Sequence, residues 1–180
     1  MSTDLVLLAR AADYAARQHI AQRRKGERAE PYINHLTEVA ALLAEATDGS
    51  DVVLVMGGLL HDTLEDTDAT YEDIEERFGS DVAALVAEVT DDKSLPKEER
   101  KRLQIEKTAG KSQRAKLLKL ADKTSNLRGL VASPPKGWPP ARLHDYVVWA
   151  HDVVRSCRGL NPQLEAAFDA AHAEARRHYG

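Results

Sequence analysis

Four residues of this sequence have the types and the spacing of metal ligands: His35, the adjacent His61 and Asp62, and Asp122. Three predicted helices supply them, so packing between helices, rather than one flexible segment, would fix their geometry. Two imidazoles and two carboxylates without a thiolate suit Mn²⁺, Fe²⁺ or Zn²⁺, and they leave coordination positions open for water and a phosphate oxygen. The set therefore predicts a divalent-metal site between central helices.

Two further carboxylates follow the histidine–aspartate pair by one helical turn. If this segment is helical, Glu65 lies at i+4 from His61, and Asp66 lies at i+4 from Asp62. Both are then placed to orient or deprotonate an attacking water without binding the metal. A lone histidine on an apolar helix is usually a satisfied core residue, but six ionisable groups are costly to bury together without a function. The pattern indicates metal-assisted hydrolysis.

The composition favours a helical protein without membrane spans. Of 180 residues, 43% are hydrophobic and only 5% are aromatic, and Ala, Leu, Glu, Arg and Lys are abundant. No apolar run approaches the length of a membrane span, and the first residues lack the basic-then-apolar pattern of a signal. The single cysteine, Cys157, excludes an intramolecular disulfide and a cysteine-rich metal site. We therefore expect a cytoplasmic protein.

The net charge of −4 conceals two oppositely charged segments. Residues 61–92 contain twelve acidic residues against one basic residue, and residues 93–119 contain ten basic residues against three acidic ones. Two solvated helix faces would have the same composition. A metal site beside an anionic small molecule also fits it, whereas the overall basic character that would indicate a polyanion partner is missing.

Apolar residues at helical spacing place the candidate ligands on separate helices. The predicted helices cover residues 5–21, 34–46, 52–64, 71–78, 81–90, 96–109, 113–131, 141–157 and 162–178. The start of the third could pass for a buried strand, but its apolar continuation favours a buried helix. A Pro- and Gly-rich stretch at residues 133–140 precedes the last two helices. We expect an all-α, compact multi-helix bundle that forms one domain over residues 1–180.

Four stretches of the sequence resemble the HD hydrolase domain of the RelA/SpoT family. They are PYINHLTEVA (residues 31–40), GGLLHDTLEDTDAT (57–70), EVTDDKSLPKEERK (88–101) and AKLLKLADKTSNLRGL (115–130). The H…HD…D skeleton alone is typical of the wide HD superfamily. The HDTLED motif together with the VTDDK segment indicates a much narrower group of proteins. The similarity covers residues 5–164 and is closest to the stand-alone small alarmone hydrolases. It implies an HD-domain fold.

The resemblance also implies a role for each matching position. The implied metal ligands, which usually hold Mn²⁺ although other divalent transition metals are possible, are His35, His61, Asp62 and Asp122. The implied catalytic acids are Glu65 and Asp66. The residues expected to contact the nucleotide or line its pocket are Arg24, Lys25, Tyr32, Asn126 and Tyr146.

The predicted nucleoside contacts come from two separate segments. Asn126 lies at i+4 from Asp122, so its amide is expected on the face of the metal ligand. Arg24 is expected to pack on the base from the opposite side of the pocket. Ser125 occupies a position where many bifunctional relatives carry a larger residue, a difference that we expect to affect base selectivity and not the metal site. Lys101, Lys107 and Lys111 are candidate contacts for the outer phosphates.

These assignments predict hydrolysis of ppGpp or pppGpp to GDP or GTP and pyrophosphate, without a second, synthetic domain. The same pocket would also fit a phosphatase acting on ppApp or on the 2′-phosphate of NADPH. A non-catalytic alarmone sensor is a third hypothesis, which the adjacent carboxylates Glu65 and Asp66 disfavour. The expected partner is a small nucleotide, with no nucleic acid, membrane or obligatory protein partner.

Overall fold

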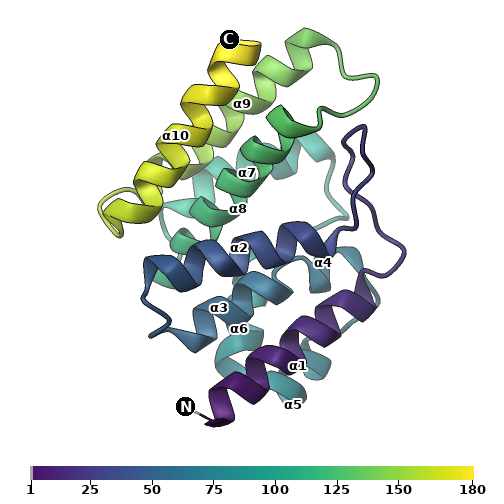
Figure 1. Cartoon of the computed structure of the whole chain (residues 1–180), viewed down its shortest axis with the longest axis vertical. Coiled ribbons are helices and arrows are strands. Elements are labelled where there is room, and N and C mark those ends of the chain that lie inside the picture. The colour runs from purple at the N-terminus through teal and green to yellow at the C-terminus, as the bar shows by residue number, and fades with distance from the viewer. Residues whose placement is uncertain (1) are drawn as a thin grey trace.

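The computed structural model describes residues 2–180, which form helices joined by loops (Figure 1). The helices are α1 (Ser2–Gln18), α2 (Ile33–Ala46), α3 (Val52–Leu60), α4 (Thr63–Asp66), α5 (Tyr71–Phe78), α6 (Ser80–Val89), α7 (Lys97–Thr108), α8 (Gln113–Ala132), α9 (Pro140–Val154), the short 3-10 helix η1 (Arg155–Cys157) and α10 (Pro162–Tyr179). Within these residues the only β-type pairings are two isolated bridges between loops. The all-α prediction is confirmed.

Helices α3 and α8 form the interior of the bundle. Helix α8 packs against α10, α2 and α9 and also contacts α3, while α3 lies against α1, α2 and α6. In Figure 1, α2 crosses the middle of the molecule, with α1 and α5 toward the N-terminal end and α9 and α10 toward the C-terminal end. Burial of nearly all of α3 explains its continuous apolar sequence, as predicted. Within residues 2–180, no helix has both the length and the apolar character that crossing a membrane requires.

Several helix ends are defined by the residues that the sequence offers there. The Asp51 side chain accepts the amide of Leu54 at 3.0 Å and begins α3. Helix α5 begins with a capping box between Thr70 and Asp73 and ends at Gly79, whose φ of 90° is accessible mainly to glycine. These boundaries match the predicted ones. Helix α1 ends three residues earlier than expected, at Gln18.

The third predicted helix is interrupted where a continuous helix was expected. Helix α3 ends at Leu60, residues 61 and 62 form a turn, and α4 begins at Thr63. The carbonyl of Gly58, which a continuing helix would bond to the amide of Asp62, is 2.9 Å from Nδ1 of the His61 ring. One helical turn persists beyond the break, since the amide of Asp66 donates to the Asp62 carbonyl at 2.9 Å. The expectation of a single helix over residues 52–64 is therefore wrong.

Two loops on the side of the bundle near α2 and α8 are bonded to each other. The amide of Glu27 donates to the carbonyl of Pro134 at 3.1 Å, and the amide of Arg28 donates to Ser133 Oγ at 3.0 Å. Gly26 forms a bridge with Pro135, and a Cβ at position 26 would lie 2.2 Å from the Ser133 carbonyl oxygen. The loops at residues 19–32 and 133–139 thus lie against each other and are joined by hydrogen bonds.

We predict that Gly58→Ala destabilises the fold. A Cβ at this position would lie 2.9 Å from Leu43 Cδ1 and 3.1 Å from Ala40 Cα, so the backbone of α2 would have to move. Overpacking costs about 1–3 kcal/mol and the helix propensity of alanine returns up to about 1 kcal/mol, so the expected net loss is about 1–2 kcal/mol. Chemical denaturation measures it. Gly110→Ala is the control, because its Cβ would meet only the Lys107 carbonyl at 3.7 Å. Equal stability of the two variants would contradict this account of the α2–α3 contact.

Candidate metal centre and adjoining pocket

The four predicted metal ligands meet at one buried point. Nε2 of His35 is 3.3 Å from Asp122 Oδ1 and 3.8 Å from Asp62 Oδ2. Nε2 of His61 is 3.1 Å from Asp62 Oδ2 and 3.8 Å from Asp122 Oδ1. Helix α2, the turn between α3 and α4, and helix α8 each contribute to this cluster. Residues far apart in sequence are therefore brought together as the spacing predicted.

The cluster has the chemistry and the dimensions of a divalent-metal site. Donor atoms of His35, His61 and Asp62 lie within 4.8 Å of one another, and Asp122 touches both imidazoles. Ligands that are each about 2.1 Å from a shared ion lie roughly 3 Å or more apart, which agrees with the observed spacings. Nε2 of both histidines is buried without a hydrogen-bond partner. Two unpartnered nitrogens facing two carboxylates fit a metal ion.

At these groups, burial and the neighbouring charges shift the pKa values in opposite directions. Burial lowers the pKa of His35, and the Asp122 carboxylate 3.3 Å away opposes this shift. Burial also lowers the pKa of His61, but the nearby Asp62 carboxylate outweighs it and raises that pKa to about 9. Burial raises the pKa of Asp62, but the charge of His61 holds it well below its usual range. The two carboxylates thus attract positive charge, which a divalent ion would supply.

Each aspartate is held by a neighbouring donor. Tyr32 donates its hydroxyl to Asp62 Oδ2 at 2.6 Å. Lys123 Nζ, which is buried, pairs with Asp122 Oδ2 at 2.8 Å, and Asn126 donates to Asp122 Oδ1 at 2.6 Å. These bonds leave Asp122 oriented with Oδ1 toward the imidazoles. Sequence reasoning missed Lys123, because neighbours in a helix ordinarily point in directions about 100° apart.

Ser125 contacts the metal cluster rather than the nucleotide pocket. Its side chain is buried, and Oγ lies 2.8 Å from Nδ1 of His35 and 2.6 Å from Oε2 of Glu38. The expectation that this position has no bearing on the metal site is therefore wrong, whereas its effect on base selectivity stays a prediction. Helix rotation is the reason: Ser125 lies one residue before Asn126, which places it on the face of α8 that packs against α2.

Glu65 and Asp66 are both anchored to the segment that follows α6. Glu65 accepts the amide of Asp91 at 3.2 Å and lies 3.5 Å from Arg100. Burial, and then the charge of Asp62, raise the pKa of Glu65 above its ordinary value. Asp66 pairs with Lys93. The acidic segment at residues 61–92 is thus neutralised in part by the basic segment that follows it.

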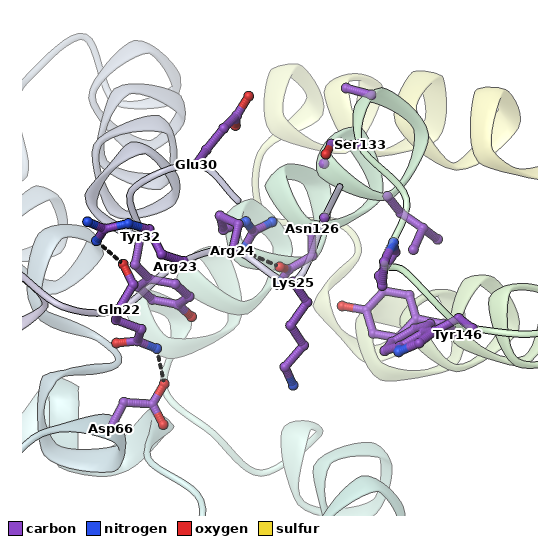
Figure 2. A pocket seen from close by; sticks show the side chains of 16 residues that line it. Gln22, Arg23, Arg24, Lys25, Glu30, Tyr32, Asp66, Asn126, Ser133 and Tyr146 are labelled. Atoms are coloured by element: carbon purple, nitrogen blue, oxygen red, sulfur yellow. Dashed lines mark hydrogen bonds between the residues drawn. The ribbon is translucent and has the colours of Figure 1, made fainter. Parts of the chain in front are cut away.

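A pocket adjoins the cluster and contains all five predicted nucleotide-contacting residues. Residues from the loop that follows α1, from α8 and from the segment that leads into α9 line it, together with Asp66. Its lining includes Gln22, Arg24, Lys25, Tyr32, Asp66, Asn126, Trp138 and Tyr146. In the view of Figure 2, Tyr32 and Tyr146 lie on opposite sides and Lys25 extends between them. Gln22, which sequence reasoning did not single out, donates to Asp66 Oδ2 at 3.0 Å.

Arg24 and Asn126 lie side by side, not across the pocket from each other. Nη1 of Arg24 donates to Oδ1 of Asn126 at 3.0 Å, as Figure 2 shows. A Cβ on Gly129, one turn after Asn126, would lie only 2.7 Å from Arg24 Nη2. Arg24 therefore lies along α8, and its predicted placement opposite Asn126 is wrong. Its guanidinium is 5.9 Å from the centre of the Tyr32 ring.

Four cations from three segments gather near the pocket. Burial lowers the pKa of Lys97, and the positive charges of Arg142, Lys101 and Lys25 lower it further. Arg142 lies 4.1 Å from the centre of the Trp138 ring, at the pocket wall. We call Lys25, Lys97, Lys101 and Arg142 the cationic cluster. The predicted phosphate role of Lys101 is compatible with it.

Lys111 lies elsewhere. Its ammonium group donates to the main-chain oxygen of Glu88, near the end of α6. It does not line the pocket that contains the nucleotide candidates. The expectation that Lys111 contacts an outer phosphate is therefore wrong, because this lysine joins α6 to the start of α8.

Comparison with known proteins agrees with this geometry. The HD domain family matches residues 11–151. Guanosine-3′,5′-bis(diphosphate) 3′-pyrophosphohydrolase MESH1 of Xenopus tropicalis is 50% identical over 169 residues, or 94% of each chain. Its namesake from Homo sapiens is 50% identical over 167 residues, or 93% of each chain.

Two solved structures have the same fold. A metazoan ortholog of SpoT that hydrolyses ppGpp and plays a role in starvation responses has a TM-score of 0.89 and 49% identity, over 93% of this chain and 94% of that one. The structure of lmo0812 from Listeria monocytogenes has a TM-score of 0.65 and 34% identity, over 81% of this chain and 98% of that one. The chain belongs to the HD-domain family, in the group of stand-alone, SpoT-like relatives that includes MESH1.

Proposed function

We propose that this protein hydrolyses the 3′-diphosphate of guanosine alarmones, so that ppGpp or pppGpp and water give GDP or GTP and pyrophosphate. The observation that carries the proposal is the buried cluster of His35, His61, Asp62 and Asp122 beside a pocket that Arg24, Tyr32, Asn126 and Tyr146 line. The names of relatives that are 50% identical over nearly the whole chain support the same reaction.

The metal proposed for this cluster is Mn²⁺. Its nitrogen and oxygen donors without sulfur support a borderline-hard ion, and Fe²⁺ or Zn²⁺ would fit the same set. When bound, such an ion lowers the pKa of water and neutralises charge on phosphate. Tyr32, Lys123 and Asn126 would keep the two aspartates in the orientation that the ion requires.

Glu65 and Asp66 are the proposed acids of the reaction. The raised pKa of Glu65 supports its use in taking a proton from the attacking water. Asp66 lies at the pocket wall, held by Gln22 and Lys93, and would orient that water or the 3′-diphosphate under attack. The water would attack the phosphorus nearest the ribose. The bond from this phosphorus to the ribose 3′-oxygen would break, the 3′-oxygen would take a proton to give the 3′-hydroxyl of GDP or GTP, and pyrophosphate would carry the oxygen of the water.

The pocket would hold the nucleoside and the second phosphate group. Arg24 and Asn126 form one hydrogen-bonded unit whose remaining donors support binding of the nucleoside, with Tyr32 and Tyr146 as the aromatic walls. The cationic cluster supports binding of the 5′-diphosphate, because Lys25 lines the pocket and Arg142 lies over Trp138 at the pocket wall.

We further propose that residues 1–180 act as one HD domain, of which residue 1 lies outside the described part of the chain. The family match over residues 11–151 and a hydrophobic core that draws on helices from α1 to α10 support this. A nucleotide substrate and a lone, buried Cys157 support a cytoplasmic location. The proposed reaction requires no nucleic acid, membrane or protein partner.

Metal removal and substrate choice test the proposal together. We expect wild-type protein with Mn²⁺ to convert ppGpp to GDP and pyrophosphate, and to lose activity after chelation. Anion-exchange chromatography of the products also reveals turnover of ppApp or NADPH. His61→Ala and Asp122→Ala should abolish turnover by losing the ion, whereas His178→Ala, an exposed histidine on α10, should keep it. Undiminished activity after exhaustive chelation would refute a metal mechanism.

Glu65→Gln should separate catalysis from binding. We expect kcat to fall about 10²–10⁴-fold, because proton transfer is lost while the side chain keeps its size. Metal content and nucleotide affinity should remain close to wild type. Glu76→Gln, on the exposed face of α5, is the control for loss of one negative charge. If bound metal falls in parallel with kcat, Glu65 is a ligand and its assigned role is wrong.

Arg24 and Asn126 should behave as one unit. Arg24→Ala or Asn126→Ala should lower kcat/KM roughly 5- to 150-fold, because each change leaves its partner unpaired. This corresponds to a loss of about 1–3 kcal/mol of transition-state stabilisation. The double variant should lose less than the sum of the two losses. Metal content is measured alongside, and Arg17→Ala on exposed α1 is the control. Additive losses would show that the two residues act independently.

A further inference from the structure

The ring of His35 has a partner on each side. Nε2 points into the cluster, 3.3 Å from Asp122 Oδ1. Nδ1, on the other side, is 2.8 Å from the hydroxyl oxygen of Ser125. A neutral imidazole carries one N–H, and only the other nitrogen has a lone pair for a metal. A hydroxyl can donate or accept, so the contact with Ser125 alone does not select the tautomer.

Glu38 removes this ambiguity. Its Oε2 is 2.6 Å from Ser125 Oγ, and a carboxylate only accepts hydrogen bonds. The hydroxyl proton of Ser125 therefore goes to Glu38, so Oγ presents a lone pair to His35. Nδ1 of His35 must then be the donor, which leaves the lone pair on Nε2, facing the cluster. The carbonyl of Gly58 imposes the same tautomer on His61.

The chain of bonds continues to the surface and spans two helices. Nη1 of Arg128 lies 3.1 Å from the second oxygen of Glu38. His35 and Glu38 are three residues apart on α2, and Ser125 and Arg128 are three apart on α8, so each pair lies on one face. Ser125 is only 1% exposed, so water cannot readily replace its hydroxyl.

We propose that Ser125 is a positioning residue for His35, and that Glu38 and Arg128 act through it to keep the Nε2 lone pair of His35 directed at the metal. The inference rests on the proposed function only in requiring a metal at this cluster. Loss of the hydroxyl would leave Nδ1 buried without a partner, and the ring would be free to change its tautomer or to rotate.

Metal affinity tests the inference without reference to turnover. Competition of the protein with a chromophoric chelator for Zn²⁺ gives the dissociation constant. We expect Ser125→Ala and Glu38→Ala to weaken Zn²⁺ binding about 10- to 100-fold. Glu38→Gln should lose less, since its amide oxygen can still accept from Ser125. Thr124→Val is the matched control, because the buried Thr124 hydroxyl bonds only to the carbonyl of Leu120.

Nitrogen NMR of the histidines supplies a second readout. In the Zn²⁺-loaded wild type, His35 should carry its proton on Nδ1, and this proton should lose its protection from exchange in Glu38→Ala. Glu38 is partly exposed, so this variant can decide the matter even if Ser125→Ala does not fold.

The outcomes separate this inference from the proposed function. Equal Zn²⁺ affinity in wild type, Ser125→Ala and Glu38→Ala would overturn it while leaving the hydrolase in place. If Zn²⁺ binding weakens in the two variants as expected but the wild type does not turn over ppGpp, the proposed function alone would be overturned. A wild type that binds no Zn²⁺ would overturn both.

Discussion

Two carboxylates and two imidazoles meet where water is largely excluded, and this burial determines what the surrounding helices must provide. Like charges at Asp62 and Asp122 would repel if left alone. Lys123 supplies a buried counter-charge at 2.8 Å, and the hydroxyl of Tyr32 and the amide of Asn126 supply donors. Apolar packing of α3 and α8 then holds these groups together, because no single segment carries more than two of the four ligands.

The donors that neutralise the metal cluster also form the wall of the pocket. Tyr32 bonds to Asp62 and lines the pocket, and Asn126 bonds to both Asp122 and Arg24. Any nucleotide that contacts Asn126 is thus one hydrogen bond away from Asp122, a proposed metal ligand. In the proposed reaction, Asn126 therefore connects binding of the nucleoside to the orientation of Asp122 at the ion. Metal occupancy and substrate affinity are then expected to influence each other reciprocally.

The sequence predicted the residue types and the helices better than the directions of side chains. Spacing identified the candidate ligands because four chemically distinctive residues fall on helices that have to pack together. The break at residues 61–62 escaped prediction because it depends on a ring-to-backbone bond between His61 and Gly58. The Arg24–Asn126 contact joins residues 102 positions apart, and no local pattern encodes it. Ser125 was misread because its neighbours in α2 were unknown.

The bonded loops at residues 19–32 and 133–139 have a consequence for how substrate range can change over evolutionary time. The proposed metal ligands lie on α2, at the α3–α4 turn and on α8, whereas Arg24, Lys25 and Trp138 lie on or beside the loops. Substitutions of side chains in the loops can change which substrate is bound without moving the residues of the metal cluster. Insertions and deletions are a different matter, because the Glu27–Pro134 bond and the tight fit of Gly26 against Ser133 make the lengths of the two loops interdependent. Diversification by this route is therefore expected to proceed through point substitutions at constant loop length, with paired changes on both loops.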